Sequence, residues 1–215
     1  MVSGSDRLTS ALPTPVAPDT RVLRLIAMRG LKAFAAATAV VVALAGGWAG
    51  YLRFSGNFHA VEEGILYRSA QLSEAQFVSH IREKGIRSIL NLRGNNAGSA
   101  WYDEEMGAST AAGIRHVDYP ISARRDLTDR QVSEIVSLLR DLPRPILVHC
   151  EAGADRSGLV SAIYEFEFRN KPPDEAAEQL SFRFGHFPWL GSQTVAMDRT
   201  LERIVSGRGD DKPTD

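Results

Sequence analysis

The feature that most constrains the fold is a short apolar run that leads into a loop of small residues and then into a helical pattern. Residues 146–148 are apolar and β-prone, a loop around Gly153 follows His149, and the helical pattern begins near Ser157. In open α/β sheets such strand–loop–helix units bind ligands at the carboxyl ends of the strands. Because the loop N–H groups and the helix N-terminus attract anions, the sequence predicts an anion site here.

Cys150 and Arg156 lie at the two ends of this loop. The helix dipole and the charge of Arg156 favour the thiolate form of Cys150, which is the nucleophilic form. Arg156 offers a planar fork that can bind two phosphate oxygens at once. The spacing allows the loop to curl so that its backbone N–H groups bind phosphate. Sulfur would attack the phosphorus and water would hydrolyse the resulting cysteinyl-phosphate, without a metal or a cofactor. The predicted substrate-binding loop residues are Glu151, Ala152, Gly153, Ala154 and Asp155.

His149-Cys150, five further residues and Arg156-Ser157 resemble the signature of the protein tyrosine phosphatase superfamily. Residues 66–69 and 89–93 look like the early strands of its small dual-specificity branch, close to the atypical plant-and-fungal type, and the resemblance extends over residues 58–185. The resemblance implies a cysteine phosphatase fold with Cys150 as the nucleophile and Arg156 as the phosphate clamp. It also implies that Ser157 assists departure of the thiolate and that His149 orients Cys150 and favours its ionised form.

A general acid must protonate the leaving oxygen, and an Asp on a separate loop normally does so. Three candidates follow the predicted strand at 114–119: Asp118, Asp126 and Asp129. Asp129 is explained by the first turn of a helix, where a carboxylate is favourable. We predict Asp126, with Asp118 as the alternative. Arg124 in the same loop either binds a second anionic group of the substrate or belongs to a solvated loop.

Strand-like and helix-like segments alternate after residue 53, which predicts an α/β domain with a mostly parallel central sheet flanked by helices. Two capping boxes, Ser73 with Gln76 and Thr128 with Gln131, mark helix starts. The predicted domain covers 53–206 and a polar tail 207–215. Its predicted strands are 65–68, 86–92, 114–119 and 145–148, and its predicted helices are 73–85, 101–112, 128–142, 157–170, 174–184 and 193–205.

The N-terminal part is predicted to be a disordered basic tail over 1–30 and a transmembrane anchor over 31–52. The uncharged run 33–52 is long enough, because a spanning helix needs about 20 mostly apolar residues. Trp48 and Tyr51 suit the membrane interface. The alternative is a cleaved signal peptide, with a small-residue site at 43–45. Positive charge precedes the run, which favours a catalytic domain on the non-cytoplasmic side, the periplasm in a bacterium.

Composition narrows the choice of partners. The formal net charge of −1 gives no support for a nucleic-acid partner, and a single cysteine excludes an internal disulfide. We expect this chain to be a tyrosine or dual-specificity phosphatase whose substrate is a phosphorylated protein. The alternative is a membrane-facing phosphatase for a lipid, sugar or inositol phosphate, although the charges of Glu151 and Asp155 would repel a heavily phosphorylated head group. A non-catalytic phosphate-binding module would be expected to lack Cys150 or Arg156.

Overall fold

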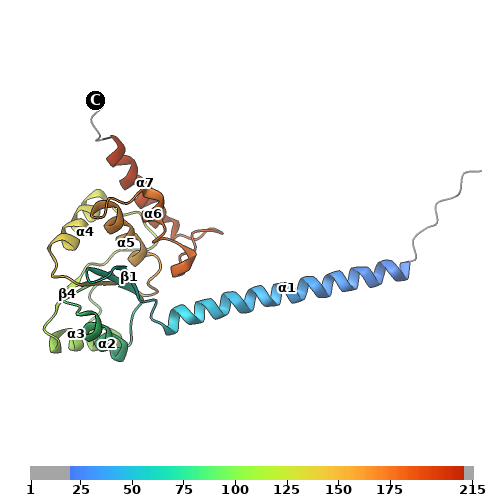
Figure 1. Ribbon diagram of the computed structural model, residues 1–215, viewed down its shortest axis with the longest axis horizontal. Coiled ribbons are helices and arrows are strands. Elements are labelled where there is room, and N and C mark those ends of the chain that lie inside the picture. The colour runs from blue at the N-terminus through green and yellow to red at the C-terminus, as the bar shows by residue number, and fades with distance from the viewer. Residues whose placement is uncertain (1–19, 211–215) are drawn as a thin grey trace, which may run out of the picture. The chain divides into compact units, whose positions relative to one another are not determined.

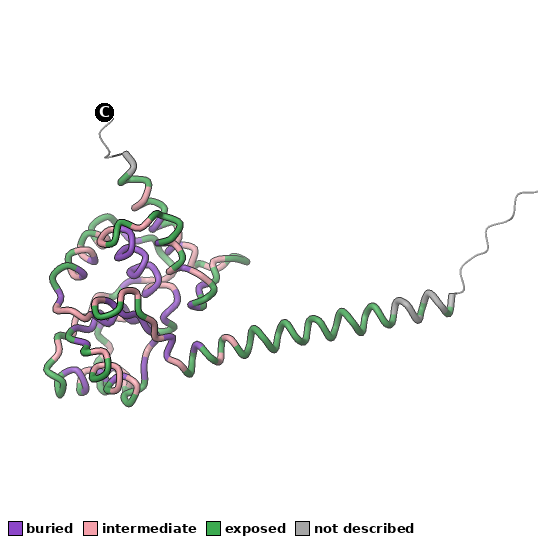
Figure 2. The backbone as a smooth tube through the Cα atoms, in the orientation of Figure 1, coloured by how far each residue is buried: buried purple, intermediate pink, exposed green. Residues whose placement is uncertain are grey.

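The computed structural model describes residues 20–210. The chain divides into two units, residues 1–47 and residues 48–215. Helix α1 (Thr20–Phe54) supplies the described part of the first unit and the first residues of the second (Figure 1). Its segment Met28–Phe54 has a mean hydropathy of 1.7 and is exposed throughout its most apolar window, as the colouring of Figure 2 shows. This length and composition fit a membrane span, and they fit a signal sequence equally well.

The start of α1 corrects the predicted boundary of the N-terminal tail. Residues 20–30 were predicted to be disordered, but they are helical. No proline lies between Pro18 and the end of α1 at Phe54, and Leu, Arg, Ala and Met all favour a helix. The remainder of the predicted tail, residues 1–19, lies outside the described residues.

The second unit is built on a five-stranded sheet in the order β1-β2-β5-β3-β4. Strand β1 is antiparallel to β2, and the other neighbours are parallel, which confirms the predicted mostly parallel sheet. In this register the last residues of β2, β3, β4 and β5 lie side by side. The segments that follow these four strands therefore begin at the same edge of the sheet. The strands are β1 (His59–Glu62), β2 (Leu66–Ser69), β3 (Ser88–Asn91), β4 (Arg115–Asp118) and β5 (Ile146–His149).

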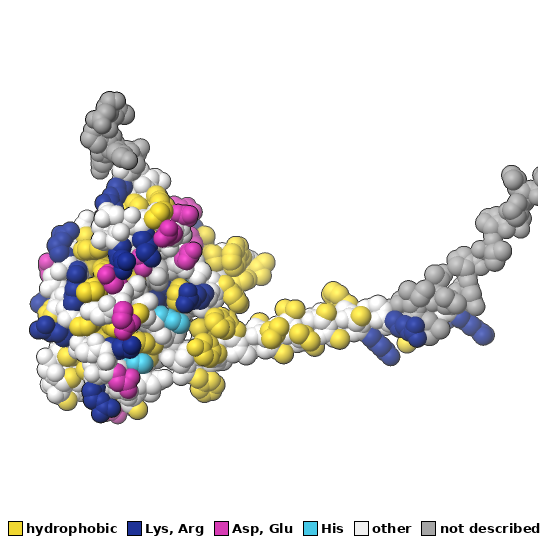
Figure 3. Space-filling model, viewed as in Figure 1, with side chains coloured by type: hydrophobic (Ala, Val, Ile, Leu, Met, Phe, Trp, Pro, Cys, Tyr) yellow, Lys and Arg dark blue, Asp and Glu magenta, His cyan; other side chains and the backbone are white. Residues whose placement is uncertain are grey.

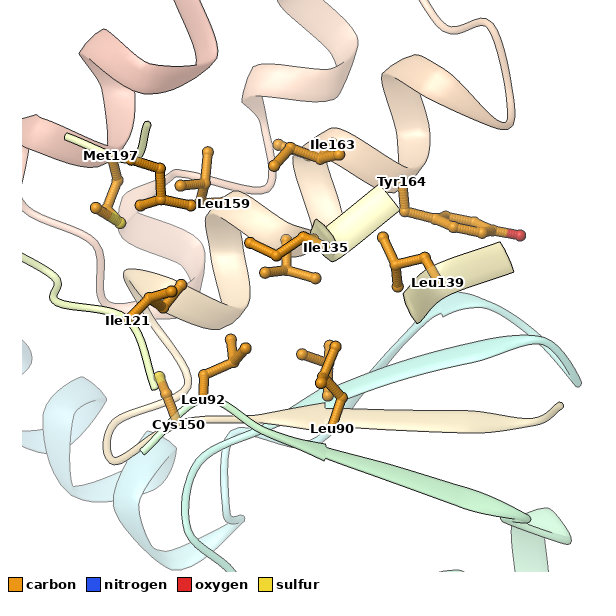
Figure 4. Close-up of a cluster of buried hydrophobic side chains, with 14 of the residues drawn as sticks. Leu90, Leu92, Ile121, Ile135, Leu139, Cys150, Leu159, Ile163, Tyr164 and Met197 are labelled. Atoms are coloured by element: carbon orange, nitrogen blue, oxygen red, sulfur yellow. The ribbon is translucent and has the colours of Figure 1, made fainter. Parts of the chain in front are cut away.

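Helices cover both faces of the sheet (Figure 1). Successive strand residues point to opposite faces, so Leu90 and Val148 pack against α4, α5 and α7, whereas Ile89 and Leu147 pack against α2 and α3. Figure 4 shows part of the larger cluster, in which Cys150 takes part. The helices are α2 (Glu74–Lys84), α3 (Ala100–Ala111), α4 (Asp129–Asp141), α5 (Arg156–Glu167), α6 (Pro173–Ala177) and α7 (Val195–Asp210), with a 3₁₀ turn, η1 (Phe182–Phe184).

Both predicted capping boxes form. The side chains of Ser73 and Thr128 accept hydrogen bonds from the backbone N–H groups of Gln76 and Gln131, whose side chains in turn accept from the cap backbone. Each box satisfies two N–H groups that the first helical turn leaves without a partner. The starts of α2 and α4 are therefore set by local sequence.

Two predicted C-terminal segments are wrong in extent. The predicted helix 174–184 is a short α6 and the separate turn η1. After α6 the carbonyl of Gln179 accepts a hydrogen bond from Arg68 on β2 (2.7 Å) in place of a helical N–H. Gly185 ends η1 in the left-handed region (φ 85°). Helix α7 runs on to Asp210, so residues 207–210 of the predicted tail are helical, and 211–215 lie outside the described residues.

Candidate active site

The loop between β5 and α5 is fixed by its carbonyl oxygens. Each carbonyl from residue 151 to residue 155 accepts a hydrogen bond from a group outside the loop's concave side. The acceptor–donor pairs are Glu151 O with Gln71 N (3.1 Å), Ala152 O with Asn57 Nδ2 (2.9 Å), Gly153 O with Arg68 Nη2 (2.6 Å), Ala154 O with Arg68 Nη2 (3.1 Å) and Asp155 O with Leu159 N (2.8 Å).

This anchoring decides where the N–H groups of the loop point. In a trans peptide the C=O of one residue and the N–H of the next are held in one plane and point in opposite directions. With the carbonyls turned into the protein, the N–H groups of residues 152–156 are turned away from it. Within residues 20–210, none of these N–H groups donates a hydrogen bond to another group of the chain. The loop is thus a cup of unpaired donors, which suits a tetrahedral oxyanion.

Arg68 supports the cup from behind. Its side chain is completely buried, and Nη1 donates to the carbonyl and to the side-chain oxygen of Gln179 (2.7 and 2.8 Å). Its guanidinium carbon lies 4.1 Å from the ring centroid of Phe184. Burial lowers the pKa of Arg68 to about 9, and the charges of Cys150 and Asp155 oppose that shift. Arg68 is therefore protonated at neutral pH and places a fixed positive charge beneath the loop.

Gly153 allows the loop to pass close to β2. Its φ of +71° is in the left-handed region, and a Cβ at this position would lie 2.5 Å from the backbone nitrogen of Ala70 and 2.7 Å from the carbonyl carbon of Ser69. Neither backbone atom can move without disturbing the sheet. The predicted loop glycine is therefore required by close backbone approach as well as by conformation.

Cys150 and His149 point to opposite faces of the sheet. Cys150 is only 3% exposed and belongs to the larger hydrophobic cluster, where its side chain lies near Leu92 and Ile121 (Figure 4). The ring of His149 is buried on the other side, where its Nε2 lies 2.9 Å from Oε1 of Glu105 on α3. His149 therefore connects the loop to α3.

Glu105 is the centre of a buried network. Its carboxylate also accepts hydrogen bonds from Nε2 of His116 (2.8 Å) and from Nε2 of Gln71 (2.8 Å). Burial would raise the pKa of this carboxyl, but the charge of His149 and the hydrogen bonds from His116, His149 and Gln71 lower it to about 2. Glu105 is therefore ionised, and it fixes the orientation of the residue that precedes Cys150.

Arg156 and Ser157 begin α5 at the same edge. The half-buried guanidinium of Arg156 donates through Nη1 to the carbonyl of Leu92 (3.2 Å), directly after β3. The buried hydroxyl of Ser157 donates to the carbonyl of Ser69 (3.3 Å). The structure thus brings both residues to the loop that carries Cys150, and in this arrangement the hydroxyl of Ser157 is bonded to β2.

Asp155 has a partner that the sequence did not reveal. Its Oδ1 lies 2.7 Å from Nδ1 of His186, a completely buried residue whose Nε2 lies 3.0 Å from Oδ2 of Asp198 on α7. Burial would lower the pKa of His186, but hydrogen bonds to the two carboxylates raise it to about 9. The imidazolium, shared between the two carboxylates, offsets part of the charge of Asp155, whereas the exposed Glu151 has no such partner among the described residues.

A second arginine lies beside the cup. The guanidinium carbon of Arg93 is 3.6 Å from the centroid of the Trp101 ring, and Nη1 donates to Oε1 of Gln71 (3.1 Å). Burial lowers the pKa of Arg93; the charge of Glu151 opposes this shift and the charge of Arg156 adds to it. The charges of Glu151 and Arg156 therefore act on Arg93. Its guanidinium is held in position by stacking on the ring of Trp101.

The structure does not bring the predicted general acid into contact with Cys150. Asp126 is exposed and receives hydrogen bonds from Arg199 on α7, the shortest from Nη2 (2.6 Å). These bonds lower the pKa of its carboxyl. Asp126 lines a hollow of about 370 Å³ together with Arg125 and Thr128, and the loop after β5 contributes no residue to that hollow.

The alternative acid, Asp118, is held by structural hydrogen bonds. It accepts from Nδ2 of Asn91 (2.7 Å) and from the hydroxyl of Tyr102 (2.5 Å) at the end of β4. Arg124 is exposed on the loop that follows, where its backbone N–H donates to Ser122. Neither carboxylate candidate is bonded to residues 150–156 in the part of the chain that the structure describes.

Four residues that support the site were not assigned to it from sequence: Asn57, Arg68, Glu105 and His186. Only Asn57 carries a local signal: it follows Gly56, and Gly and Asn are the residue types that best tolerate the positive φ that both adopt (66° and 47°). The others are ordinary charged residues in the sequence, and the contacts that connect them to the loop or to His149 span more than 30 positions. For residues 20–210, no group of three or more His, Cys, Asp or Glu side chains could hold a metal ion.

A buried cysteine at the end of a parallel strand, inside a cup of backbone donors closed by an arginine, defines the class of cysteine-dependent phosphatases. The family model described as DSP-PTPase phosphatase fused to NAD+ kinase matches residues 51–195, more than half of the chain. The chain belongs to this family and is a cysteine phosphatase of the dual-specificity type, as the sequence signature predicted. A search of curated proteins finds no match.

Solved structures share the fold at low sequence identity. TpbA of P. aeruginosa is 24% identical, with 69% of this chain and 85% of that chain covered and a TM-score of 0.53. The core catalytic domain of the PP-IP phosphatase SIW14 of S. cerevisiae is 20% identical, with 71% and 93% covered and a TM-score of 0.53. PTPMT1 is 15% identical, with 72% and 99% covered and a TM-score of 0.53. These likenesses concern the fold of the second unit.

Proposed function

We propose that this phosphatase hydrolyses a phosphomonoester of a protein, on tyrosine or with dual specificity, through a cysteinyl-phosphate at Cys150. The observation that carries the proposal is the cup itself: five tethered carbonyls that leave the N–H groups of 152–156 unpaired around the end of β5. Fixed donors of this kind stabilise the charge that develops on the equatorial oxygens of phosphorus. Arg156, at the first turn of α5, would bind two of these oxygens.

The proposed reaction has two steps. The thiolate of Cys150 attacks phosphorus, the bond from phosphorus to the ester oxygen breaks, and that oxygen takes a proton from the general acid, for which we propose Asp126 with Asp118 as the alternative. Water then attacks the phosphorus and gives a proton back to the ionised acid, the sulfur–phosphorus bond breaks, and inorganic phosphate and the thiolate are released. Ser157 would assist this departure, and His149 would hold Cys150 in place through its bond to Glu105 (2.9 Å). No metal or cofactor takes part in either step.

Hydrolysis of an aryl phosphate by the full chain in detergent micelles with EDTA tests the chemistry. We expect metal-independent turnover that Cys150→Ser abolishes and that Glu104→Gln, an exposed change on α3, leaves intact. Trapping a phosphorylated wild-type protein by acid quench would identify the intermediate. Equal turnover in Cys150→Ser, or loss of turnover on addition of EDTA, would contradict the proposal.

A second candidate substrate is a membrane phosphomonoester such as a lipid, sugar or inositol phosphate. It is favoured by the apolar segment Met28–Phe54, which would keep the site close to a bilayer. Among the similar structures, one of TpbA is described as a complex with pTyr and one of PTPMT1 as a complex with PI(5)P. Phosphotyrosine peptides and lipid monophosphates, compared by kcat/KM in the same micelles, decide between the two substrate classes.

We also propose that residues 31–52 anchor the chain in a membrane and that the phosphatase domain, 53–206, lies on the non-cytoplasmic side. The charge pattern supports this orientation, since Arg21, Arg24, Arg29 and Lys32 precede the apolar run and only Arg53 follows it closely. Reporter fusions at the C-terminus test the side. The mass of the mature protein distinguishes an anchor from a cleaved signal peptide, which would remove at least the residues up to the cleavage site.

A further inference from the structure

The second unit carries an exposed apolar patch next to the end of α1. Its members are Phe182, Phe187, Trp189 and Leu190, with exposed fractions of 50%, 43%, 58% and 94%. The ring centroids of Phe187 and Trp189 are 5.0 Å apart, and those of Phe182 and Phe187 are 6.5 Å apart. Large apolar side chains gathered in this way on a protein surface mark an interaction site.

The chain connects this aromatic patch to the last turns of α1. Nε1 of Trp48 donates to the carbonyl of Phe182 (3.3 Å), and Leu52 is buried so close to the loop that a Cβ on Gly185 would lie 3.2 Å from it. Tyr51 and Phe54 are exposed in the same turns. Figure 3 shows hydrophobic side chains gathered on the side of the domain where α1 ends.

Charge distinguishes this surface from an ordinary loop. The sequence contains no Asp or Glu from residue 182 to residue 197, and Arg183 is the only exposed charged side chain between 182 and 190. Aromatic rings with a neighbouring cation are the composition of segments that lie in the lipid–water interface, where rings sit at headgroup level and cations meet anionic lipids. The adjoining turns of α1 end the candidate membrane span Met28–Phe54.

We propose that the aromatic patch docks on the surface of the phospholipid bilayer that α1 enters, so that the domain rests on the membrane through two adjacent contacts. The inference rests on the proposed anchor. Its consequence concerns the active site: Asn57 donates to the carbonyl of Phe184 (2.8 Å) and to that of Ala152 in the cup (2.9 Å). A docked patch therefore holds the phosphate cup close to the headgroups.

Tryptophan fluorescence in vesicles tests the docking, because the chain has three tryptophans, Trp48, Trp101 and Trp189. Full-length variants that retain one tryptophan each, with Phe at the other two positions, are reconstituted into vesicles of phosphatidylcholine and phosphatidylglycerol. The lipids carry bromine either near the glycerol end or near the far end of the acyl chain. Trp189 should be quenched more strongly than Trp101, and most strongly by bromine near the glycerol end.

Substitutions within the patch provide the matched comparison. In the Trp189-only background, Phe187→Ser with Leu190→Ser should reduce quenching at least twofold. Val78→Ser, which removes a 49% exposed side chain from α2, should leave it unchanged. Both variants alter exposed residues, so we expect them to fold, and circular dichroism checks that they do before quenching is compared.

The Trp48-only variant separates failure of the patch from failure of the anchor. If Trp48 is quenched and Trp189 is quenched no more than Trp101, the anchor stands and the docking proposal is overturned. If Trp189 is blue-shifted but not quenched, the patch packs against protein, for instance a second copy of this chain, and lipid docking is again overturned. If neither Trp48 nor Trp189 is quenched, both proposals fail together.

Discussion

At the scale of single residues, we expect the reactivity of Cys150 to depend on Glu105, a carboxylate that acts through His149. Glu105 holds His149, and removing its charge while keeping its shape should weaken that restraint. A charge-assisted hydrogen bond contributes about 1.5–3 kcal/mol, so Glu105→Gln should lower kcat/KM roughly 10- to 100-fold. Alkylation of Cys150, the only cysteine, should slow in parallel. The exposed neighbour Glu104→Gln is the control, and unchanged alkylation in Glu105→Gln would refute a positioning role.

The proposed acid can be tested through the basicity of the leaving group. Asp126→Ala should lower kcat about 10²- to 10⁴-fold for phosphotyrosine and much less for an aryl phosphate whose leaving oxygen needs no proton. Asp118→Asn is the matched comparison, because Asp118 is bonded to Asn91 and Tyr102. If Asp118→Asn shows the leaving-group dependence and Asp126→Ala does not, the assignment of the acid is reversed.

The bond between Asp126 and Arg199 predicts a pH effect with a definite sign. An acid catalyst acts in its protonated form, so the rate falls as pH rises through its pKa. Arg199 lowers the pKa of Asp126. Arg199→Gln should therefore move the alkaline limb of the kcat profile to higher pH, provided that Asp126 is the acid. If the alkaline limb does not move in Arg199→Gln, Asp126 is not the residue that gives the proton to the leaving oxygen.

At the scale of elements, the cup depends on how closely its loop passes β2. Gly153→Ala should lower turnover about 100-fold or more, because displacing preorganised donors has costs of this order. Gly64→Ala is a matched control: Gly64 has a similar φ of +75°, but a Cβ there meets no atom within 4 Å. Backbone strain alone costs about 1–2 kcal/mol. Comparable turnover in the two variants would show that conformation, and not contact with β2, is the constraint.

His186 joins the start of α5 to α7, and its contribution to stability should depend on pH. Its folded-state pKa, about 9, lies above its ordinary value of 6.5, so the stabilisation is complete below about pH 6.5 and is lost as pH rises through 9. His186→Gln should cost about 2–3 kcal/mol at pH 6 and much less at pH 10. Denaturant unfolding at both values measures this. Asp198→Asn should show the same trend, and a pH-independent cost would point to packing alone.

Local signals explain which elements could be predicted from the sequence. Capping boxes at Ser73 and Thr128, and the apolar run of β5 before a glycine loop, act within a few residues, and all three features formed. In the segment 174–184, which was misassigned, the carbonyl of Gln179 accepts a hydrogen bond from Arg68, on β2, in place of a helical N–H. Likewise, nothing near Asp155 in the sequence indicates that His186 offsets part of its charge. Long-range polar partners leave no periodicity to detect.

At the scale of the whole molecule, the site is assembled from segments far apart in the chain. Asn57, Arg68 on β2, Leu92 after β3 and the first turn of α5 all contact the loop of Cys150 or its arginine. Displacing any one of these elements would therefore break a hydrogen bond to a carbonyl of the loop or the hydrogen bond that holds Arg156. The phosphate cup should form and unfold together with the domain, and the free energy of anion binding should appear in the stability of the fold.

Oxyanion binding should accordingly stabilise the full chain against unfolding. A ligand at about 100 times its dissociation constant adds about 2.7 kcal/mol, which corresponds to a rise in Tm of roughly 5–10 °C for a domain of this size. Inorganic phosphate should produce this rise in the wild type and in Cys150→Ser, because the donors are backbone N–H groups and Arg156. Arg156→Ala should abolish most of it. A rise that survives in Arg156→Ala but disappears in Cys150→Ser would mean that the anion binds through the thiol, contrary to the arrangement of the loop.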